Sequence, residues 1–372
     1  MRELLKNYIQ QKEDYAITYE EYMNIALYHE TYGYYMKDTE KIGKSGDFIT
    51  SSNVSDVFGK LFAHVFYKIF EKHHLPPIIC EIGGGNGRFA KSILDEWDKI
   101  NTPVTYIIIE TSPYHRQLQQ KILPIGNHVK QYESLEEAQK AYPAFQGIIL
   151  SNELFDAFPI RMIEKKDEQL FEVMISINDD DALTEVLFPL TDEHVLDYLH
   201  TQNIELVNEQ RFEVPLAMVD FTRKLSKFLD KGVVFTIDYG YTNEEWSLPP
   251  HRKGSLRGYH QHTMIQNPLE KPGEMDLTTH ISFDALIDYG RKEGLEFVAK
   301  LRQDEFLLSA GILTFLQEHH DPNPFSEESK RNRAIRSLIM AGSMSQSFHV
   351  VMQEKHTGAK IEDCVDSTGL QN

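Results

Sequence analysis

Three polar residues, Asn152, Glu153 and Asp156, are the strongest candidates for chemistry, because they follow an apolar run at residues 147–151. In a doubly wound sheet the carboxyl ends of the strands line the ligand crevice, so these side chains are expected to face a ligand. Asn152 could accept a hydrogen bond from a nitrogen, and either carboxylate could hold a cation or take its proton. We predict a catalytic role for all three; the alternative is that Asn152 or Asp156 simply caps the next turn.

Glycines make up a second group, in which Gly83, Gly85 and Gly87 form a GxGxG run two residues after Glu81. The apolar run at residues 78–82 predicts a buried strand, and residues 88–97 predict a helix. Glycines allow a sharp turn and a close approach of the backbone to a ligand. This strand, loop and helix therefore predict a nucleoside-cofactor site, with a plain tight turn as the alternative.

Glu110 ends another apolar run, at residues 104–109, about 25 residues after the glycines. An acid at the tip of the second strand is where such sheets hold ribose hydroxyls. Dinucleotides and S-adenosylmethionine are both bound in this way. The dinucleotide fingerprint GxGxxG needs a glycine at position 88, which holds Arg88, so the spacing favours S-adenosylmethionine.

His280 is the histidine best placed for chemistry, because Asp276, Thr278 and His280 would point the same way in an extended segment. A histidine near a carboxylate could shuttle a proton. The alternative is a helix-entry segment with Ser282 as the cap. The other histidines lack the spacing of metal ligands, and we predict no metal site.

The elements that must position these residues alternate between strand and helix. Further apolar runs at residues 129–132 and 233–237 predict a parallel sheet with crossover helices, and thus an α/β fold. After Pro159 the pattern changes to a hairpin, at residues 170–177 and 183–188, whereas residues 241–279 are predicted to be a long loop. The predicted divisions are an N-terminal helical extension at 1–75, a core at 76–159 and 231–354, an inserted α+β lobe at 160–230 that covers the cleft, and a polar tail at 355–372.

Composition fits a globular enzyme of 372 residues, with 41% hydrophobic and 26% charged residues. The net charge of −19 argues against nucleic acid as a partner and suits a basic one, although an acidic surface can simply keep a protein soluble. Only Cys80 and Cys364 are present, so a disulfide framework is excluded and a cytoplasmic location is expected. The N-terminus shows no signal-peptide pattern or mitochondrial presequence, and no apolar run is long enough to insert into a membrane.

Several segments together resemble the MidA-like family of S-adenosylmethionine-dependent methyltransferases, whose mitochondrial members act in complex I assembly. They extend from about residue 30 to 295, and the stretches at 46–50 and 152–159 are the most specific. The others lie at 33–35, 57–59, 81–87, 110–113, 238–240, 254–257 and 273–283. The chain departs from the family at Gly84, Arg88 and residues 51–53, where the family tends towards proline, threonine and an Ala-Pro-Glu run.

The resemblance implies a seven-stranded Rossmann-like methyltransferase sheet and S-adenosyl-L-methionine as the cofactor. It further implies that Glu81 and the three glycines hold the cofactor, that Glu110 holds its ribose, and that Asp47 and Thr50 contact it nearby. The implied reaction is methylation of a protein arginine. Carboxylates would suit that acceptor, because a guanidinium must be anchored and must lose a proton. We expect Glu153 and Asp156 to serve here, with His280 in support.

Two other functions remain open at this point. One is an assembly or interaction factor that binds S-adenosylmethionine without turnover. The other is methylation of a small molecule or of RNA, and the acidic charge counts against RNA.

Overall fold

The computed structural model describes residues 1–372 except 42–54, 101, 319–322, 324, 341–346 and 366–372. Its internal contacts divide the chain into two compact units, each built from three segments. Unit 1 comprises Met1–Phe48, Phe155–Arg223 and Gly240–Tyr289, and unit 2 comprises Ile49–Leu154, Lys224–Tyr239 and Gly290–Asn372. The predicted division into core, insertion and tail stays a prediction.

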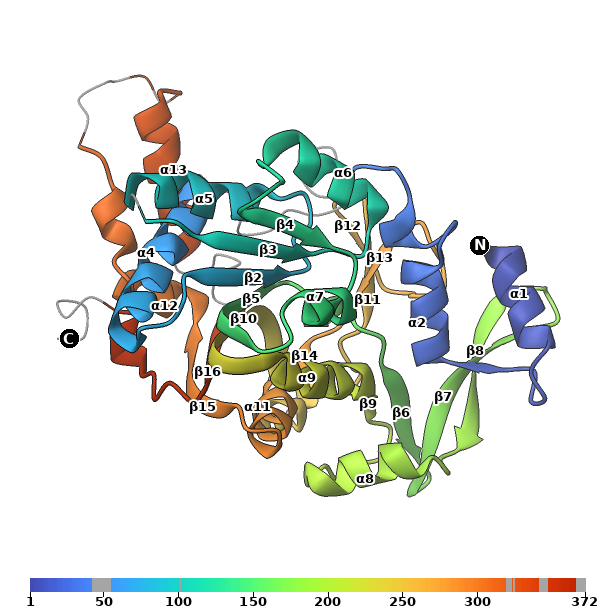
Figure 1. Ribbon diagram of the computed structural model, residues 1–372. Helices are drawn as coiled ribbons and strands as arrows, with labels where there is room; N and C mark the ends of the chain where they lie inside the picture. The colour runs from blue at the N-terminus through green and yellow to red at the C-terminus, as the bar shows by residue number, and fades with distance from the viewer. Residues whose placement is uncertain (42–54, 101, 319–322, 324, 341–346, 366–372) are drawn as a thin grey trace. The chain divides into compact units, whose positions relative to one another are not determined.

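Unit 2 is built on a sheet in which seven strands follow the order β15-β16-β10-β5-β2-β3-β4 (Figure 1). The strands from β4 to β10 are parallel, whereas β16 is antiparallel to both β10 and β15. This arrangement confirms the predicted Rossmann-like methyltransferase fold. The strands are β2 (Ile78–Ile82), β3 (Thr105–Ile109), β4 (Val129–Tyr132), β5 (Phe145–Asn152), β10 (Leu229–Tyr241), β15 (Glu296–Arg302) and β16 (Phe348–Lys355).

The strand order reverses at β2, which lies between β3 and β5. Such a switch point is where open α/β sheets bind their ligands, just beyond the carboxyl ends of the strands. The register pairs Ile82 of β2 with Ser151 of β5. Gly83 and Asn152 are the next residues of the two strands, and therefore lie at the same edge of the sheet.

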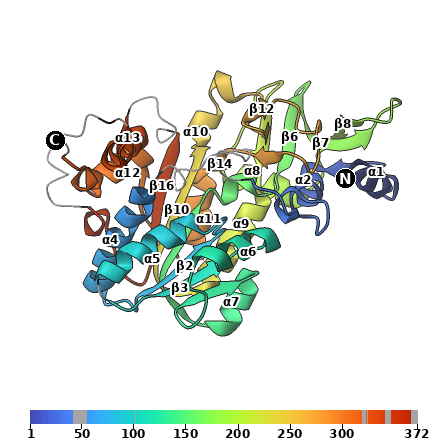
Figure 2. The ribbon, with the colours of Figure 1, turned by 90° about the horizontal axis from the view of Figure 1, so that it is seen from above.

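Helices α4 and α5 cover this sheet through one apolar core. Phe58, Phe62 and Phe66 recur every four residues on α4, so they lie on one face of that helix, and Phe66 packs with its ring centroid 5.4 Å from that of Phe235 on β10. Helices α12 and α13 lie side by side in unit 2 (Figure 2). Their apolar side chains belong to the same core. The helices of unit 2 are α4 (Asp56–His73), α5 (Arg88–Ile100), α6 (Pro113–Ile122), α7 (Leu135–Ala141), α12 (Gln303–Ser309) and α13 (Glu327–Ile339), with short 3-10 turns at Ile312–Phe315 and Ile361–Asp363.

The sequence predicts a single helix over residues 303–318, and the helix in the structure is shorter. It ends at Ser309, and a separate 3-10 turn follows Gly311, whose φ is 95°. A positive φ interrupts a right-handed helix, and glycine adopts it at little cost.

Unit 1 contains a five-stranded antiparallel sheet and its own apolar core. The hairpin expected after Pro159 is confirmed, because β7 and β8 pair from Ile177 with Leu183 to Phe171 with Pro189. The elements are α1 (Arg2–Gln10), β1 (Ile17–Thr18), α2 (Tyr19–Tyr28), η1 (Tyr34–Met36), β6 (Arg161–Lys166), β7 (Gln169–Ile177), β8 (Leu183–Pro189), α8 (Glu193–Thr201) and β9 (Arg211–Val214), while α9 (Leu216–Phe228) and α11 (Phe283–Lys292) run from one unit into the other.

The prediction of a long loop over residues 241–279 is wrong in part. A three-stranded sheet forms there, in the order β12-β11-β13. Strands of three or four residues are too short to show an alternating pattern, which explains why the sequence did not reveal them. The elements of this stretch are α10 (Asn243–Trp246), η3 (Pro249–His251), β11 (Arg257–His260), β12 (Thr263–Ile265) and β13 (Asp276–Thr278), followed by β14 (Ile281–Ser282), which pairs with β10.

Candidate functional site

The glycine loop of unit 2 turns through three positive φ angles, 74° at Gly83, 51° at Gly85 and 80° at Gly87. The N–H of Gly83 donates to the carbonyl of Ile109 at 2.8 Å, which ties the start of the loop to β3. A side chain in this backbone region is strained, so all three positions favour glycine.

Gln119 supports this loop from α6, although in the sequence it is only one of several polar residues in a helical segment. Its side chain is fully buried, and Nε2 donates to the carbonyl of Gly85 at 2.8 Å. Its Oε1 accepts from Gln131 Nε2 at 2.7 Å. The backbone at Gly84 leaves no room for a side chain. A Cβ there would lie 2.5 Å from Ile108 Cγ2 and 3.2 Å from Gln119 Nε2.

Glu110 follows β3 and is 8% exposed. Its two carboxylate oxygens accept from two backbone amides, Oε2 from Gly85 N–H and Oε1 from Ser112 N–H, each at 2.8 Å. Carboxylate oxygens have lone pairs for more than one donor, so the group can still accept from a ligand hydroxyl. Glu110 therefore joins the glycine loop directly to the tip of the second strand.

Glu81, on β2 just before the loop, is almost fully buried. Burial raises the pKa of its carboxyl group to about 8, although the Tyr106 hydroxyl, which donates to Oε2 at 2.9 Å, favours the charged form. Glu81 thus carries a perturbed pKa at the switch point of the sheet, as functional carboxylates often do.

Asn152 ends β5, and Glu153 follows it directly at the same edge of the sheet. Asn152 Nδ2 donates to Glu153 Oε1 at 3.1 Å, whereas the buried Oδ1 of Asn152 has no hydrogen-bond partner in the described part of the chain. Glu153 has a φ of 53°, and its N–H donates to the carbonyl of Ile237 on β10 at 2.9 Å. A non-glycine residue in this region is uncommon and often marks a functional site.

Asp156 belongs to unit 1, where it lies in the short turn η2 (Phe155–Ala157) and is 5% exposed. Its carbonyl accepts from the N–H of Thr279 at 2.8 Å, and the next carbonyl, of Ala157, accepts from the Tyr28 hydroxyl at 2.9 Å. The neighbouring Tyr35 stacks on Tyr28 and donates to Asp276 Oδ1 at 2.7 Å.

Tyr35 links these carboxylates electrostatically. Burial, together with the negative charges of Asp276 and Asp156, raises the pKa of the Tyr35 hydroxyl well above its usual value. Unit 1 therefore brings Asp156, Asp276 and two tyrosines together, from three distant segments of the chain.

His280 also lies in unit 1. Its ring stacks on Tyr241 at 4.4 Å between centroids, and its Nδ1 lies 3.4 Å from Arg257 Nη2. Burial and the nearby charge of Arg257 lower the pKa of His280 to about 3, so the ring is neutral at pH 7. A neutral Nδ1 accepts from the guanidinium, which favours a role in positioning Arg257.

The other predicted site residues lie in separate parts of the structure. Asp47 and Thr50 fall outside the described residues. Glu81, the three glycines, Glu110, Asn152 and Glu153 belong to unit 2, and Asp156 and His280 belong to unit 1. The functional roles of all these residues stay predictions.

Comparison with known proteins then decides the family. The family described as putative S-adenosyl-L-methionine-dependent methyltransferases matches residues 61–300, which is more than half of the chain. The chain belongs to this family. The resemblance seen in the sequence motifs is thereby confirmed, and the chain is an S-adenosylmethionine-dependent methyltransferase.

Relatives of this methyltransferase are found among animals. The mitochondrial protein arginine methyltransferase NDUFAF7 of Danio rerio is 24% identical over 367 residues, covering 89% of this chain and 82% of the relative. Its Drosophila melanogaster homologue is 26% identical over 294 residues, which cover 71% of this chain but only 64% of the relative.

A solved structure extends the comparison to nearly the whole chain. A Burkholderia thailandensis protein bound to S-adenosyl-homocysteine superposes with a TM-score of 0.88 at 25% identity, covering 99% of this chain and 96% of that protein. The fold of this methyltransferase is therefore shared at full length with a protein that binds the demethylated cofactor.

The residues of unit 2 fit S-adenosylmethionine on independent grounds. The glycine loop avoids side chains where its backbone turns, Glu110 keeps acceptor capacity at the second strand, and Asn152 Oδ1 is a buried acceptor with no partner among the described residues. An amino group or a hydroxyl of a ligand could donate to that oxygen.

The described residues contain neither a membrane-spanning helix nor a cluster of metal ligands. No described helix is long and apolar enough to cross a membrane. In the same part of the chain, no group of three or more His, Cys, Asp or Glu side chains could hold a metal ion.

Proposed function

We propose that this chain is a protein arginine N-methyltransferase. The observation that carries the proposal is the pair Asn152 and Glu153 at the switch point, with an unpartnered buried amide oxygen and a strained, partly exposed carboxylate residue. The animal relatives, named as protein arginine methyltransferases, support the same acceptor.

The cofactor would be held by the glycine loop of unit 2. We assign Gly83, Gly85 and Gly87 to its close backbone contacts, Glu110 to its ribose and Glu81 to the loop entrance. When bound, S-adenosylmethionine supplies an electrophilic methyl group on a sulfonium. The residues around it must then only align an acceptor nitrogen and handle its proton.

An arginine acceptor gives the Glu153 carboxylate of unit 2 a chemical role. A guanidinium is always protonated in water and offers five N–H donors, so a carboxylate can anchor it in a fixed orientation. The N–C bond forms as the S–C bond breaks, and the methylated nitrogen releases a proton. We assign that proton to Glu153, with Asn152 Oδ1 accepting a guanidinium N–H. The catalytic role of Asp156, which belongs to unit 1, stays a prediction.

The test is methyl transfer to the proteins of a strain from which the gene has been deleted. Purified protein is incubated with that lysate and S-adenosylmethionine labelled on the methyl group, and acid hydrolysates are analysed for methylated arginine. We expect labelled methylarginine with the unaltered protein and at least a hundredfold less with Glu153→Gln, since it removes a proton acceptor.

Glu209→Gln is the matched control, because Glu209 is an exposed residue of unit 1. It should methylate as well as the unaltered protein. Label in another amino acid would contradict the arginine assignment, and normal transfer by Glu153→Gln would contradict the catalytic assignment.

A binding factor without turnover is the second candidate. It predicts that S-adenosylmethionine binds while no label is transferred, and that Glu153→Gln and Asp156→Asn both complement the deletion strain fully. Loss of complementation by either variant would argue for the enzyme.

We also propose a reducing, cytoplasmic location. Cys80 and Cys364 are both buried free thiols, and burial raises the pKa of Cys364 to about 12, so both groups are inert thiols rather than disulfide partners. Fractionation of cells followed by immunodetection would test the location.

A further inference from the structure

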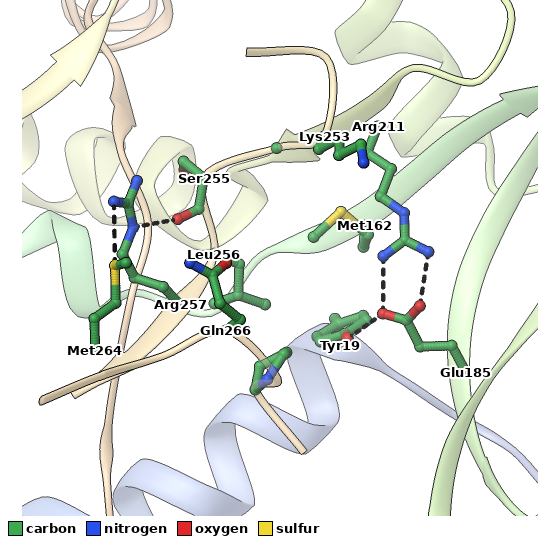
Figure 3. A pocket seen from close by; sticks show the side chains of 12 residues that line it. Tyr19, Met162, Glu185, Arg211, Lys253, Ser255, Leu256, Arg257, Met264 and Gln266 are labelled. Carbon is green, nitrogen blue, oxygen red and sulfur yellow. Dashed lines mark hydrogen bonds and ion pairs between the residues drawn. The ribbon is translucent and has the colours of Figure 1, made fainter. Parts of the chain in front are cut away.

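Unit 1 contains a pocket of about 240 Å³ that no part of the proposed transfer step uses (Figure 3). It is lined by polar and charged side chains, among them three cations and a single acid. The cations are Arg211, Lys253 and Arg257, and the acid is Glu185. In a chain with a net charge of −19, a pocket with an excess of positive charge is unusual.

The acid of the pocket is already neutralised. Arg211 grips Glu185 through two parallel hydrogen bonds, from Nη1 at 3.0 Å and Nη2 at 2.7 Å, and Tyr19 adds a third (Figure 3). Burial would raise the pKa of Glu185, but Arg211 and Tyr19 outweigh it and lower the pKa. This pair therefore contributes no free charge to the pocket.

Arg257 differs from two other arginines of unit 1. Arg161 pairs with Glu172 and Asp192, and Arg211 pairs with Glu164 and Glu185, whereas Arg257 forms no ion pair in the described part of the chain. It does feel the buried Glu213 carboxylate, because burial raises the pKa of Glu213 and the charge of Arg257 acts to lower it.

The donors of Arg257 are only partly satisfied. Its Nε donates to the Ser255 carbonyl at 2.8 Å, and its Nη2 faces the neutral ring of His280. Among the residues that the structure describes, its Nη1 meets only the Met264 sulfur, at 3.9 Å. Since sulfur is a weak acceptor, donors of this guanidinium remain for a ligand.

The loop that carries Arg257 is rigidly held. The buried carboxylate of Glu213 accepts from the N–H of Ser255 at 2.6 Å and of Leu256 at 3.0 Å. Gly254 has a φ of 78°, and a Cβ there would lie 2.5 Å from Glu213 Oε1. The Ser255 hydroxyl accepts from the N–H of His280 at 2.8 Å. The segment 254–257, which is among those that resemble the family, thus serves to present one guanidinium.

We propose that this pocket binds a carboxylate through Arg257, and that the carboxylate belongs to an aspartate or glutamate of the polypeptide that is methylated. A planar guanidinium fork matches a carboxylate, and Lys253, exposed and without an ion pair among the described residues, adds a second positive charge. Met162, Leu256 and Pro268 line the pocket with apolar surface that suits the methylene groups of a glutamate.

Carboxylate binding stands by itself, whereas the identity of the ligand as part of the acceptor rests on the proposed function. The net negative charge would attract a basic acceptor, and this pocket would require an acidic residue in the same polypeptide. This combined requirement would make the enzyme selective for acceptor polypeptides that carry both basic and acidic residues.

The experiment follows the guanidinium signals of the full chain labelled with ¹⁵N-arginine, with the Arg257 signal assigned from the spectrum of Arg257→Lys. The probes are sodium glutarate, sodium phosphate, and two arginine peptides that differ only by having glutamate or glutamine at one position. We expect glutarate and the glutamate peptide to shift the Arg257 signal. Calorimetry should show at least tenfold weaker binding of both by Arg257→Gln, and an intermediate loss by Arg257→Lys.

Lys330→Gln is the control for a simple loss of positive charge, because Lys330 lies on α13 and pairs with Glu327. It should bind the probes as the unaltered protein does. Circular dichroism and thermal melts of Arg257→Gln show whether the fold is retained, and the Arg257 signal of the unaltered protein tests the pocket without any variant.

Each outcome separates the two proposals. If neither glutarate nor the glutamate peptide shifts the Arg257 signal, or if phosphate alone does, the pocket proposal is wrong. A shift by glutarate but not by the peptide overturns the assignment to the acceptor and leaves a small free carboxylate as the ligand. If the glutamate peptide binds at Arg257 but no arginine is ever methylated, the proposed function fails while the pocket proposal holds.

Discussion

Replacing Glu110 by glutamine tests both the glycine loop and the ribose assignment, with little change in side-chain volume. The carboxylate accepts from the backbone N–H groups of Gly85 and Ser112, each at 2.8 Å. The amide has only one oxygen, so one of these N–H groups must face an NH₂ group. The glycine loop then loses a contact or turns away from β3.

The hydrogen bonds of Glu110 allow both the loss of stability and the loss of cofactor affinity to be estimated. A hydrogen bond to a charged group contributes about 1.5–3 kcal/mol, so we expect the free energy of unfolding to fall by roughly that amount. If a ribose hydroxyl also donates to Glu110, the affinity for S-adenosyl-homocysteine should fall by a further similar amount, about 10- to 150-fold in Kd.

The assay is calorimetric titration of Glu110→Gln with S-adenosyl-homocysteine, well below its melting temperature. Glu133→Gln is the matched control, because Glu133 follows the next strand but is exposed and pairs with Arg116 at the surface. Exposed pairs contribute about 0–1 kcal/mol, so that variant should bind normally. Unchanged binding by Glu110→Gln would refute the ribose assignment, and unchanged stability would refute the account of the loop.

Three further predictions concern the surroundings of the same loop. Because the folded pKa of Glu81 is raised to about 8, the folded state holds its proton more tightly, and stability falls as pH rises from about 4.5 to 8. Glu81→Gln should therefore resist urea better than the unaltered protein above pH 8, with a gap that narrows on acidification; a constant gap would contradict the raised pKa. Gln119→Leu should lower the free energy of unfolding in urea by about 1–3 kcal/mol, because the Gly85 carbonyl loses its donor. The same variant should bind the cofactor more weakly in calorimetry, and normal binding would show that the loop does not need this hydrogen bond. Gly84→Ala should lower the free energy of unfolding in urea by about 1–3 kcal/mol, because the new Cβ would collide with Ile108 Cγ2. The same substitution made in an Ile108→Ala background should cost less, and an equal cost there would show that this collision is not the cause.

Elements governed by local pattern could be predicted from the sequence. The strand at 78–82, the helix starting at Arg88 and the strand at 129–132 appear with the expected bounds or nearly so. An apolar run in a parallel sheet is buried on both faces, so its hydrophobicity marks it without knowledge of its neighbours. The GxGxG run and the residue at position 88 likewise favoured S-adenosylmethionine over a dinucleotide. The positions of the glycines decide where the loop can adopt positive φ, and this is a property of the sequence alone.

Strands of only three or four residues could not be predicted from local pattern. The strands β11, β12 and β13 contain three or four residues each, so their pairing depends on partners far apart in the chain rather than on their own composition. The helix at 303–318 was predicted too long, because a single glycine inside a helical pattern gives no local sign that its φ will be positive.

By itself, then, the sequence determined the sheet, the glycine loop and the family, because strand hydrophobicity, glycine spacing and motif order are properties of the chain alone. Only the tertiary structure decided which polar groups are already satisfied. It placed Gln119 under the glycine loop, lowered the pKa of His280 to about 3 beside Arg257, and left Arg257 without an ion pair among the described residues. Burial and hydrogen-bond partners come from residues distant in sequence, so no local pattern reports them.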